Sequence, residues 1–188
     1  LEQGGGRVRV LCRQDEKEYW LETSLLHPLI KGGDSKRYCL AKTDLVIVFP
    51  YGPVEGEGVG LIPADELSER YPLTWEYLGA HKNALQGRED GKMIGPKWYG
   101  YVYPKALDVM DLPKIFTPDI APLASFSLDA SGTQFFTGGV SGGYGILPED
   151  GLSLEYLLGL LNSRAVDWFL QRTSTQMRGG YYSYEARF

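Results

Sequence analysis

The sequence predicts an α+β fold with mixed or antiparallel β-sheets and about three helices. Short segments rich in aromatic and β-branched residues recur between glycine and proline turns, and the 188 residues include 24 glycines and 13 tyrosines. Segments of this composition are typical of short β-strands. Helical periodicity occurs in only three places, and strands and helices do not alternate as regular βαβ units. The length suits one domain, with room for a second small lobe.

Ten segments have the composition and boundaries of strands. They are residues 7–12, 17–22, 44–51, 58–63, 97–104, 113–118, 125–130, 133–138, 144–148 and 180–185. In the segment 97–104, strict alternation would place Trp98 on one face and Tyr99, Tyr101 and Tyr103 on the other. One of these faces is expected to join the core, which leaves the other available to a ligand.

Three helices are predicted. The first covers residues 63–72, with Pro63 in its first turn, and the second covers residues 72–90. The third covers residues 153–171 and begins with Ser153 as its N-cap. Apolar residues recur along the third helix at helical spacing, and this stripe is predicted to be buried: Leu154, Leu157, Leu158, Leu161, Ala165, Trp168 and Phe169.

The charge distribution limits the class of partner. A net charge of −5 argues against a uniformly basic nucleic-acid binder. The charge is uneven, however, because residues 54–79 carry six acidic side chains against one basic, whereas residues 31–42 carry four basic against one acidic. Residues 164–187 are also basic. Such asymmetry permits an anionic partner at a local patch, beside the plainer reading that these charges only solvate the surface.

Few residues carry the usual metal or catalytic chemistry. Cys12 and Cys39 lie outside metal-ligand spacing and are expected to be two buried thiols in a reducing cytosol. His27 and His81 have no partner at i+4, so no zinc site is predicted. Residues 52–60 carry two glutamates where a phosphate loop needs bare amides, and are expected to form a turn beside a strand. The sequence therefore predicts no catalytic residue, metal or cofactor within this chain.

No membrane or secretory segment is predicted. The first ten residues lack an apolar core, and the longest apolar stretches are far too short to span a bilayer. The chain begins without methionine and with a glycine run, so it is expected to be a fragment of a larger protein. A cytoplasmic location is expected.

Three places combine basic side chains with glycine, aromatic residues or a strand, and are candidates for contact with nucleic acid. Residues 31–38 surround a glycine pair with three cations, so backbone amides and cations together are able to meet phosphates. Residues 87–104 mix cations with aromatic side chains of the kind that stack on bases or wedge between them. Lys114 stands in a short proline-bounded strand, where a charge is unexpected if both faces are buried.

The order of segments along the chain is more informative than any one of them. Seven segments follow one another: "HPLIKGGDSKRY", "DLVIVFPY", "YPLTWEYLGAHKNALQGRE", "KWYGYVYP", "PKIFTPDIAPLASFSLDASGTQF", "YLLGLLNSRAVDWFL" and "RGGYYSYEARF". This order resembles the C-terminal specificity domain, or target-recognition domain, of TaqI-like adenine-N6 DNA methyltransferases. The same domain type occurs in fused restriction-modification enzymes of the Eco57I kind. The resemblance runs from about residue 25 to the end.

The resemblance implies a domain that holds double-stranded DNA against an upstream methyltransferase domain of the same polypeptide and reads the target sequence. Residues 1–24 are then a β lead-in from the upstream region, and residues 25–188 the recognition domain. The family's catalytic motif, Asn/Asp-Pro-Pro-Tyr/Phe, is absent, and "VFPYGP" does not replace it. Catalysis and S-adenosylmethionine binding are expected in the parent protein, with or without an endonuclease domain, and not in this piece.

Eight residues are predicted to contact DNA: Lys31, Lys36, Arg37, Arg88, Lys97, Tyr99, Lys114 and Arg178. Methylation requires a base to leave the stack, so such an enzyme must hold the duplex on both sides of that base. Arg178 stands beside a glycine pair that gives the turn its freedom in φ, before a strand on which Tyr182 and Tyr184 share one face. The acidic residues 54–79 are expected to face away from DNA.

Two other functions fit parts of the sequence. The main alternative is a protein-interaction or structural module that packs on the catalytic domain and touches DNA little. A carbohydrate-binding β domain would explain exposed aromatic residues, but it predicts a secreted protein, which the lack of disulfides and of a signal peptide disfavours.

Overall fold

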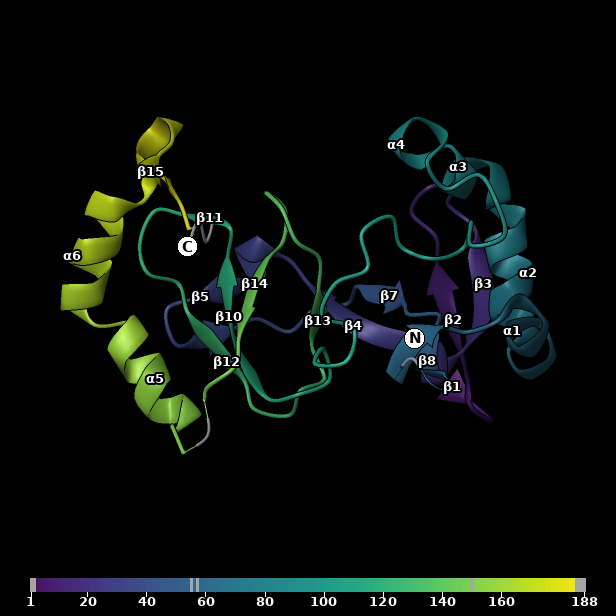
Figure 1. Cartoon of the computed structure of the whole chain (residues 1–188), viewed down its shortest axis with the longest axis horizontal. Helices are drawn as coiled ribbons and strands as arrows, with labels where there is room; N and C mark the ends of the chain where they lie inside the picture. Colours follow the sequence, from purple (N-terminus) through teal and green to yellow (C-terminus); the bar gives the residue numbers. More distant parts are fainter. Residues whose placement is uncertain (1–2, 55, 57, 150, 185–188) are drawn as a thin grey trace. The chain divides into compact units, whose positions relative to one another are not determined.

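The computed structural model describes all residues except 1–2, 55, 57, 150 and 185–188. The chain forms two compact units. Unit 1 comprises the described residues up to His27 together with Val48–Val109, and unit 2 comprises Pro28–Ile47 together with the described residues from Met110 onward. Figure 1 shows the elements of each unit. Small mixed and antiparallel sheets with several helices confirm the predicted α+β class.

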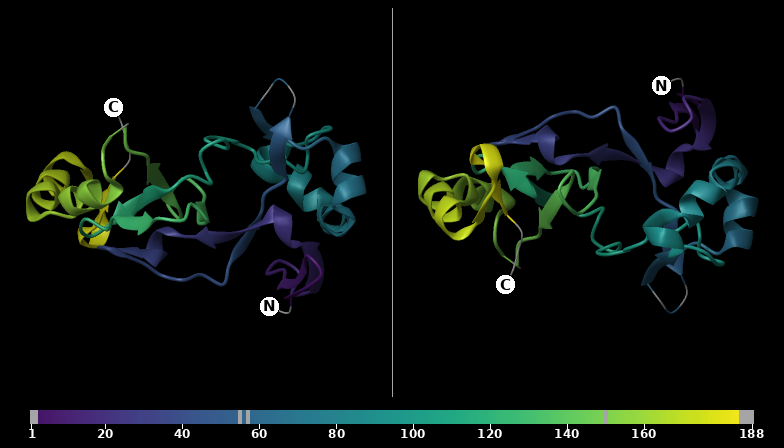
Figure 2. Two further views of the ribbon diagram at one scale, coloured as in Figure 1. Left: turned by 90° about the horizontal axis from the view of Figure 1, so that it is seen from below. Right: turned by 90° about the horizontal axis from the view of Figure 1, so that it is seen from above.

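Unit 1 combines a three-stranded antiparallel sheet, a separate β-hairpin and a group of short helices. The sheet has the order β1-β2-β3, and the hairpin pairs β8 with β9. Figure 2 shows this hairpin on the opposite side of unit 1 from the sheet. The elements are β1 (Gln3–Gly4), β2 (Arg7–Leu11), β3 (Glu18–Glu22), η1 (Thr23–Leu25), β8 (Tyr51–Val54), β9 (Gly58–Leu61), α1 (Ala64–Arg70), α2 (Pro72–Ala80), α3 (Lys82–Gln86) and α4 (Arg88–Gly91).

The core of unit 1 is formed by side chains of its helices and of the segments that precede and follow those helices. In β2, Val8 and Val10 are buried whereas the alternate arginines are not, as a half-buried strand requires. Helix α2 packs against β3. The central cluster of buried side chains comprises Leu25, Ile62, Leu67, Leu78, Trp98 and Tyr99.

The N-terminus of α2 is capped by a side chain from the sheet. Glu22, at the end of β3, accepts the backbone N–H groups of Leu73 and Thr74 at 3.0 and 2.8 Å, and the Thr74 hydroxyl at 2.6 Å. Burial raises the pKa of Glu22, but these hydrogen bonds outweigh the burial and hold the pKa below its ordinary value. A carboxylate at this end also suits the positive pole of the helix.

Unit 2 consists of small sheets covered on one side by two helices. Its sheets have the orders β12-β10-β14, β11-β16-β15 and β5-β6. The elements are η2 (Gly32–Asp34), β5 (Ser35–Lys36), β6 (Cys39–Leu40), β10 (Lys114–Pro118), β11 (Ile120–Ala121), β12 (Ser127–Asp129), β13 (Phe135–Phe136), β14 (Gly143–Ile146), α5 (Leu154–Leu161), α6 (Arg164–Thr173), β15 (Thr175–Gln176), η3 (Arg178–Gly180) and β16 (Tyr182–Ser183).

Two strands belong partly to each unit. Strand β4 (Leu26–Ile30) begins in unit 1 and ends in unit 2, and β7 (Val46–Val48) runs back into unit 1. They form a sheet of order β13-β4-β7, in which β13 pairs with the end of β4 in parallel. The sequence did not predict β4. The predicted boundary between residues 24 and 25 concerned the extent of the recognition domain and stays a prediction.

The predicted third helix is two helices. Side chains cap both starts, since the Ser153 hydroxyl accepts the Tyr156 N–H and the Ser163 hydroxyl accepts the Val166 N–H, each at 3.2 Å. Asn162 ends α5, and its side-chain amide pairs with the backbone of Phe126 through both an N–H and a C=O. The periodicity continues across this break, so the sequence pattern did not reveal it.

The predicted stripe faces the core along α5 only, and its leucines there are half-buried. The leucines of the stripe pack against Ile115, Ala124 and Phe126 of unit 2, and Figure 1 shows α5 beside β12 and β10. Trp168 and Phe169 are 58% and 57% exposed, and Ala165 is also exposed. The prediction was therefore wrong for these three residues, because α6 turns them away from the core.

The other predicted segments lie close to where the sequence placed them, with corrections. The second predicted helix is divided into α2, α3 and the short α4. Residues 97–104 form turns and bends instead of a strand. Cys12 is buried as predicted, but Cys39 is exposed. The predicted strand 180–185 appears as β16, and Glu185 lies outside the described residues. No helix in the described part of the chain is long and apolar enough to cross a membrane.

Candidate nucleic-acid interface

The eight predicted contact residues are divided between the two units. Unit 1 contains Arg88, Lys97 and Tyr99, and unit 2 contains the other five. Four of the eight are exposed: Lys31, Lys36, Lys97 and Arg178. Arg37 and Arg88 are half-buried, and Tyr99 and Lys114 are buried. DNA contact by any of them stays a prediction. Their contacts within the protein distinguish the exposed side chains, which are available to a partner, from those that are bonded within the fold.

Arg88 organises the loop that follows the helices of unit 1. Its Nε donates to the Leu85 carbonyl at 2.8 Å, and one Nη donates to the carbonyls of Trp98 and Gly100 at 2.9 and 2.8 Å. Burial lowers the pKa of the guanidinium from its ordinary value. Two carbonyls of the predicted strand 97–104 are thus bound by a side chain, whereas in a sheet a neighbouring strand would bind them.

The aromatic residues of this loop point inward. Tyr99 is 5% exposed and donates its hydroxyl to the Ile62 carbonyl at 2.7 Å, and burial raises its pKa. Trp98 lies in the same core and meets Trp75 at a ring distance of 5.5 Å. Trp98 and Tyr99 were expected on opposite faces of a strand, and both are buried, so neither face as a whole is available for stacking on bases. Tyr103 is the exposed aromatic side chain of the predicted set.

The same loop displays lysines beside an apolar cavity. Lys92, Lys97 and Lys105 are exposed, and the Lys92 ammonium lies 4.0 Å from the centre of the Tyr103 ring. A cavity of about 500 Å³ within unit 1 is lined mainly by apolar groups, together with Lys92 and Lys97. Its other lining residues include Tyr51, Leu61, Met93, Ile94, Tyr101 and Leu107. The cavity was not predicted, because its walls come from the β8–β9 hairpin and from the loop 92–107, part of which was predicted to be a strand.

In unit 2, the segment 31–38 displays two lysines on a tightly fixed backbone. Lys31 N–H donates to the Asp34 carboxylate at 2.8 Å, and Gly32 N–H donates to the Ser141 carbonyl at 3.1 Å. A Cβ at Gly32 would stand 2.8 Å from the Gly142 carbonyl oxygen, so only glycine fits this approach. The backbone N–H groups of Lys31 and Gly32, which were predicted to be available to phosphate, are therefore bonded within the protein. Lys31 and Lys36 themselves are exposed.

Arg37 is turned inward, unlike its neighbour Lys36. Both Nε and one Nη donate to the backbone carbonyl of Asn162, with Nε at 3.0 Å. Asn162 is the C-cap of α5, so the guanidinium lies at the negative pole of that helix. Arg37 therefore fastens the segment 31–38 to the end of α5.

Lys114 is buried in an internal ion pair. It is 2% exposed, and its ammonium lies 2.8 Å from the Asp129 carboxylate, with further bonds to the carbonyls of Met110 and Leu112 at 2.7 and 3.2 Å. Asp129 also accepts the Gln134 N–H at 2.9 Å. The three N–H bonds of the ammonium thus have acceptors, which explains how a charge is tolerated in a strand buried on both faces.

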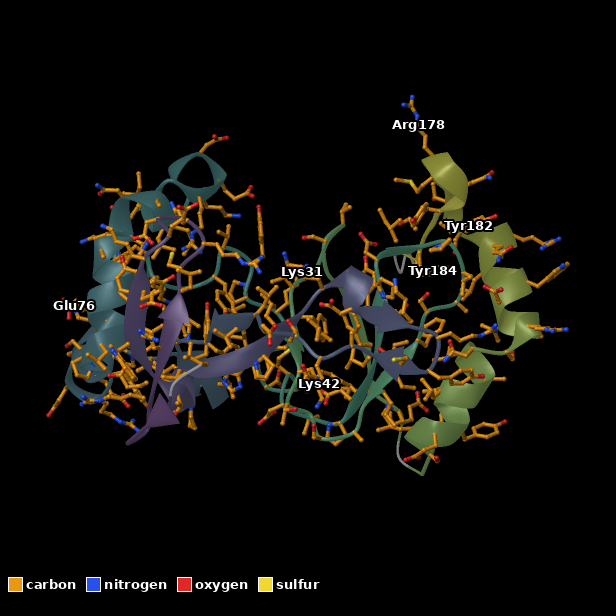
Figure 3. All side chains as sticks on the ribbon, turned by 180° about the vertical axis from the view of Figure 1, so that it is seen from behind. Lys31, Lys42, Glu76, Arg178, Tyr182 and Tyr184 are labelled. Carbon is orange, nitrogen blue, oxygen red and sulfur yellow. The ribbon has the colours of Figure 1, made fainter. Side chains whose placement is uncertain are left out.

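Arg178 extends from a turn at the edge of unit 2, away from the ribbon (Figure 3). Strands β15 and β16 flank this turn and pair antiparallel, and β16 also pairs with β11. Gly179 has φ of 77°, a conformation that favours glycine. Arg178 is the most C-terminal of the exposed predicted contacts.

Sequence comparison identifies the family of the chain. A family model described as the TaqI-like C-terminal specificity domain matches residues 66–187, well over half of the chain. The type II restriction enzyme and methyltransferase RM.Eco57I of Escherichia coli is 28% identical over 180 residues, which are 89% of this chain and 18% of that protein. The chain therefore spans less than a fifth of the length of this relative. On this match, the chain belongs to the family of TaqI-like C-terminal specificity domains.

Proposed function

We propose that this chain reads a target sequence in double-stranded DNA for a separate adenine-N6 methyltransferase domain. The observation that carries the proposal is the family match, which includes segments of both units. A relative with the same kind of region is named as a restriction enzyme and methyltransferase. In the parent protein, the other domain would bind S-adenosylmethionine and transfer the methyl group, while this region positions the duplex.

The displayed cations supply the contacts that such a role requires. Phosphate contacts by lysine and arginine fix the register of the protein on DNA, and side chains that reach base edges read the sequence. We assign phosphate contact to Lys31, Lys36, Lys97 and Arg178, because each is exposed. We assign Arg37 and Arg88 a positioning role, because their guanidinium groups hold the loops that carry Lys36 and Lys97.

The acidic helices of unit 1 fit the expected direction of binding. Glu76 projects from the outer side of α2 (Figure 3), and Glu66 and Glu69 lie on α1. A carboxylate repels phosphate, so we place this face of unit 1 away from DNA or toward another part of the parent protein.

A second function is favoured by one observation. Trp168 and Phe169 on α6 are more than half exposed, and Arg172 lies 4.0 Å from the Trp168 ring centre. Exposed aromatic side chains next to an arginine are common in protein interfaces. This surface supports the alternative that the chain docks on another domain of its parent protein. The two functions are compatible if α6 docks and the displayed lysines bind DNA.

The complete polypeptide that contains this chain provides the main test. It is incubated with duplex DNA and labelled S-adenosylmethionine, and the methylated sequence is mapped. The same is done after this region is exchanged for the corresponding region of RM.Eco57I. We expect adenine methylation at a defined sequence, and a different sequence after the exchange. An unchanged sequence in an active hybrid would show that target recognition lies elsewhere.

A second experiment tests the assigned contacts. Lys36→Gln and Lys97→Gln are each expected to weaken DNA binding and to reduce the salt dependence of the binding constant by about one unit of log–log slope. Lys17→Gln is the matched control, because Lys17 is also exposed but lies in the turn between β2 and β3. If all three variants show the same slope of binding constant against salt concentration, Lys36 and Lys97 do not contact DNA.

A third experiment tests the docking role of α6. If Trp168→Ser lowers methylation while DNA binding is kept, that role is supported.

A further inference from the structure

Three side chains that bind metals in other proteins meet in unit 1, apart from the displayed lysines. They are Cys12, Asp15 and His81, whose donor atoms all lie within 4.8 Å of one another. Cys12 and Asp15 belong to the turn between β2 and β3, and His81 lies at the C-terminal end of α2. The sequence predicted no metal site because His81 is 69 residues from Cys12 and has no partner on its own helix.

The spacing of the donor atoms matches a tetrahedral metal site. Cys12 Sγ lies 3.5 Å from His81 Nε2, and His81 Nε2 lies 3.4 Å from Asp15 Oδ2. In a tetrahedral zinc site the bonds are about 2.3 Å to sulfur and about 2.0–2.1 Å to nitrogen and oxygen, which places neighbouring ligand atoms about 3.3–3.6 Å apart. The two distances therefore fall where a shared ion would put them.

The histidine is oriented with its lone pair toward the other two residues. His81 Nδ1 lies 2.9 Å from the backbone carbonyl of Tyr77. A carbonyl only accepts hydrogen bonds, so Nδ1 carries the proton, and in the neutral ring Nε2 presents a lone pair. A metal-bound histidine commonly has this arrangement, in which the second nitrogen donates to a backbone carbonyl and fixes the tautomer.

The other two residues are also held by neighbours. Tyr19 donates its hydroxyl to Asp15 Oδ2 at 2.6 Å, and the Lys17 N–H donates to Asp15 Oδ1 at 3.2 Å. The Tyr77 hydroxyl lies 3.6 Å from Cys12 Sγ. These tyrosine and backbone donors surround the three ligand atoms, as second-shell groups do around metal sites.

A hydrogen-bonded cluster without an ion is the competing explanation. In such a cluster, a proton on His81 Nε2 would bridge to the Asp15 carboxylate across the 3.4 Å contact. A cation bound by all three donor atoms satisfies the same distances, so metal titration decides between the two arrangements. The side chains of His81 and Asp15 are 11% and 27% exposed, which leaves a route for an ion from solvent.

We propose that Cys12, Asp15 and His81 bind a divalent transition-metal ion, with Zn²⁺ as the ion that this sulfur, nitrogen and oxygen donor set favours. Because the ligands come from the β2–β3 turn and from α2, the ion fastens that turn to the helix. The proposal does not depend on DNA recognition, and it assigns the ion a structural role.

Cobalt provides the direct test, because Co²⁺ replaces Zn²⁺ and absorbs visible light with an intensity that reports tetrahedral geometry. The purified whole protein is stripped with a chelator and titrated with Co²⁺, then with Zn²⁺. We expect one equivalent of Co²⁺ to give a thiolate-to-metal charge-transfer band and visible bands, which Zn²⁺ then removes. Absence of a thiolate band in the wild-type protein would overturn the proposal.

The chain supplies its own matched controls. Cys12→Ser and His81→Gln are expected to lower the affinity for Co²⁺ by at least about 100-fold, since each removes a ligand. Cys39→Ser and His27→Gln change the other cysteine and the other histidine, and are expected to keep it. Equal loss in Cys12→Ser and Cys39→Ser, or no loss in either, would refute the site.

A variant that keeps all three ligands guards against simple misfolding. Tyr19→Phe removes only the hydroxyl that orients Asp15, and it is expected to weaken metal binding by about 10–100-fold. In the wild-type protein, added Zn²⁺ is expected to raise the unfolding temperature, and a chelator to lower it; Cys12→Ser should respond to neither. If the chelator leaves the wild-type unfolding temperature unchanged and Zn²⁺ does not raise it, the cluster is held by hydrogen bonds alone.

Discussion

Each unit fastens one end of a helix with a charged side chain from another element, but the two units use opposite charges. In unit 1, the Glu22 carboxylate binds the free N–H groups at the start of α2. In unit 2, the Arg37 guanidinium binds the free carbonyl at the end of α5. Each charge matches the pole of its helix. In both units, the end of the helix therefore determines the sign of the charged side chain that binds its unpaired backbone groups.

The buried cations extend the comparison. Arg88 of unit 1 binds only carbonyl oxygens, whereas Lys114 of unit 2 also has a carboxylate partner. Arg88 is half-buried and Lys114 is almost fully buried. A cation that keeps some access to water needs only dipoles around it, while a fully buried one requires a counter-charge. Four substitutions test these differences, beginning with the largest expected effect.

Lys114→Met should destabilise unit 2 most. It leaves the Asp129 carboxylate buried without its partner, and removing one member of a buried ion pair costs about 3–5 kcal/mol. The double variant Lys114→Met, Asp129→Leu is expected to recover much of that loss. Urea denaturation, followed by hydrogen exchange in β10 and β12, measures both. If the single variant is as stable as the wild type but binds DNA less well, Lys114 is a contact residue instead.

Arg88→Met should come next, and its effect belongs to unit 1. Three carbonyl acceptors lose a charged donor, for an expected cost of about 2–4 kcal/mol. Residues 97–104 are expected to exchange their amide hydrogens faster, because Arg88 holds two of the carbonyls in that loop. Lys97→Met serves as the control for the same loop, with little effect on stability. Faster exchange in both variants would show that the loop depends on more than Arg88.

Arg37→Met is expected to destabilise unit 2 by about 1–2 kcal/mol, since its two nitrogens share one acceptor at a half-buried site. Lys36→Met, one residue earlier, should change the free energy of unfolding by less than about 0.5 kcal/mol. Thermal unfolding of the two variants measures the difference. If the two variants are equally stable, the hydrogen bonds of Arg37 to the Asn162 carbonyl do not stabilise unit 2.

Glu22→Gln should have the smallest effect, and pH distinguishes it from Arg37. The pKa of Glu22 is lower in the folded protein than its ordinary value, so its contribution is present above about pH 4.5 and is lost as the pH falls through the folded value. We expect the wild type to be more stable than Glu22→Gln by about 1 kcal/mol at neutral pH, with the difference shrinking below about pH 4.5.

The matching measurement is the free energy of unfolding of both proteins between pH 3 and pH 7. Arg37 stays charged over this range, so the difference between wild type and Arg37→Met should not follow the same curve. If the difference in unfolding free energy between wild type and Glu22→Gln is constant over this range, the charge of the Glu22 carboxylate does not contribute to stability.

The sequence predicted the elements better than the roles of individual charges. Residue composition and segment boundaries identified β2 and β3, and apolar periodicity identified the helical region that contains α5 and α6. The break at Asn162 escaped detection, because it depends on pairing with Phe126, 36 residues earlier. Arg37 and Arg88 looked like DNA contacts, because nothing in the local sequence shows which carbonyl oxygens the fold brings to them.

The candidate site shows the same limit. Lys36 and Lys97 are exposed, and their contact with DNA stays a prediction, whereas the burial of Tyr99 and Lys114 could be recognised only from the three-dimensional arrangement. Residues 97–104 have strand composition, yet two of their carbonyl groups are bound by the Arg88 guanidinium instead of a neighbouring strand. Long-range side-chain contacts with the backbone are the part that sequence patterns do not encode.

The passage of the chain between the two units has a consequence for its synthesis. Pro28–Ile47 belongs to unit 2, yet unit 1 is completed by residues up to Val109 before the rest of unit 2 begins. The Ser35 hydroxyl, for example, donates to the Ser125 carbonyl, 90 residues later. At about 5–20 residues per second, that segment waits on the order of 5–20 s on the ribosome for its partners. Unit 1 is thus able to fold first, while the segment Pro28–Ile47 still lacks the later strands β10, β12 and β13 that contact it in unit 2.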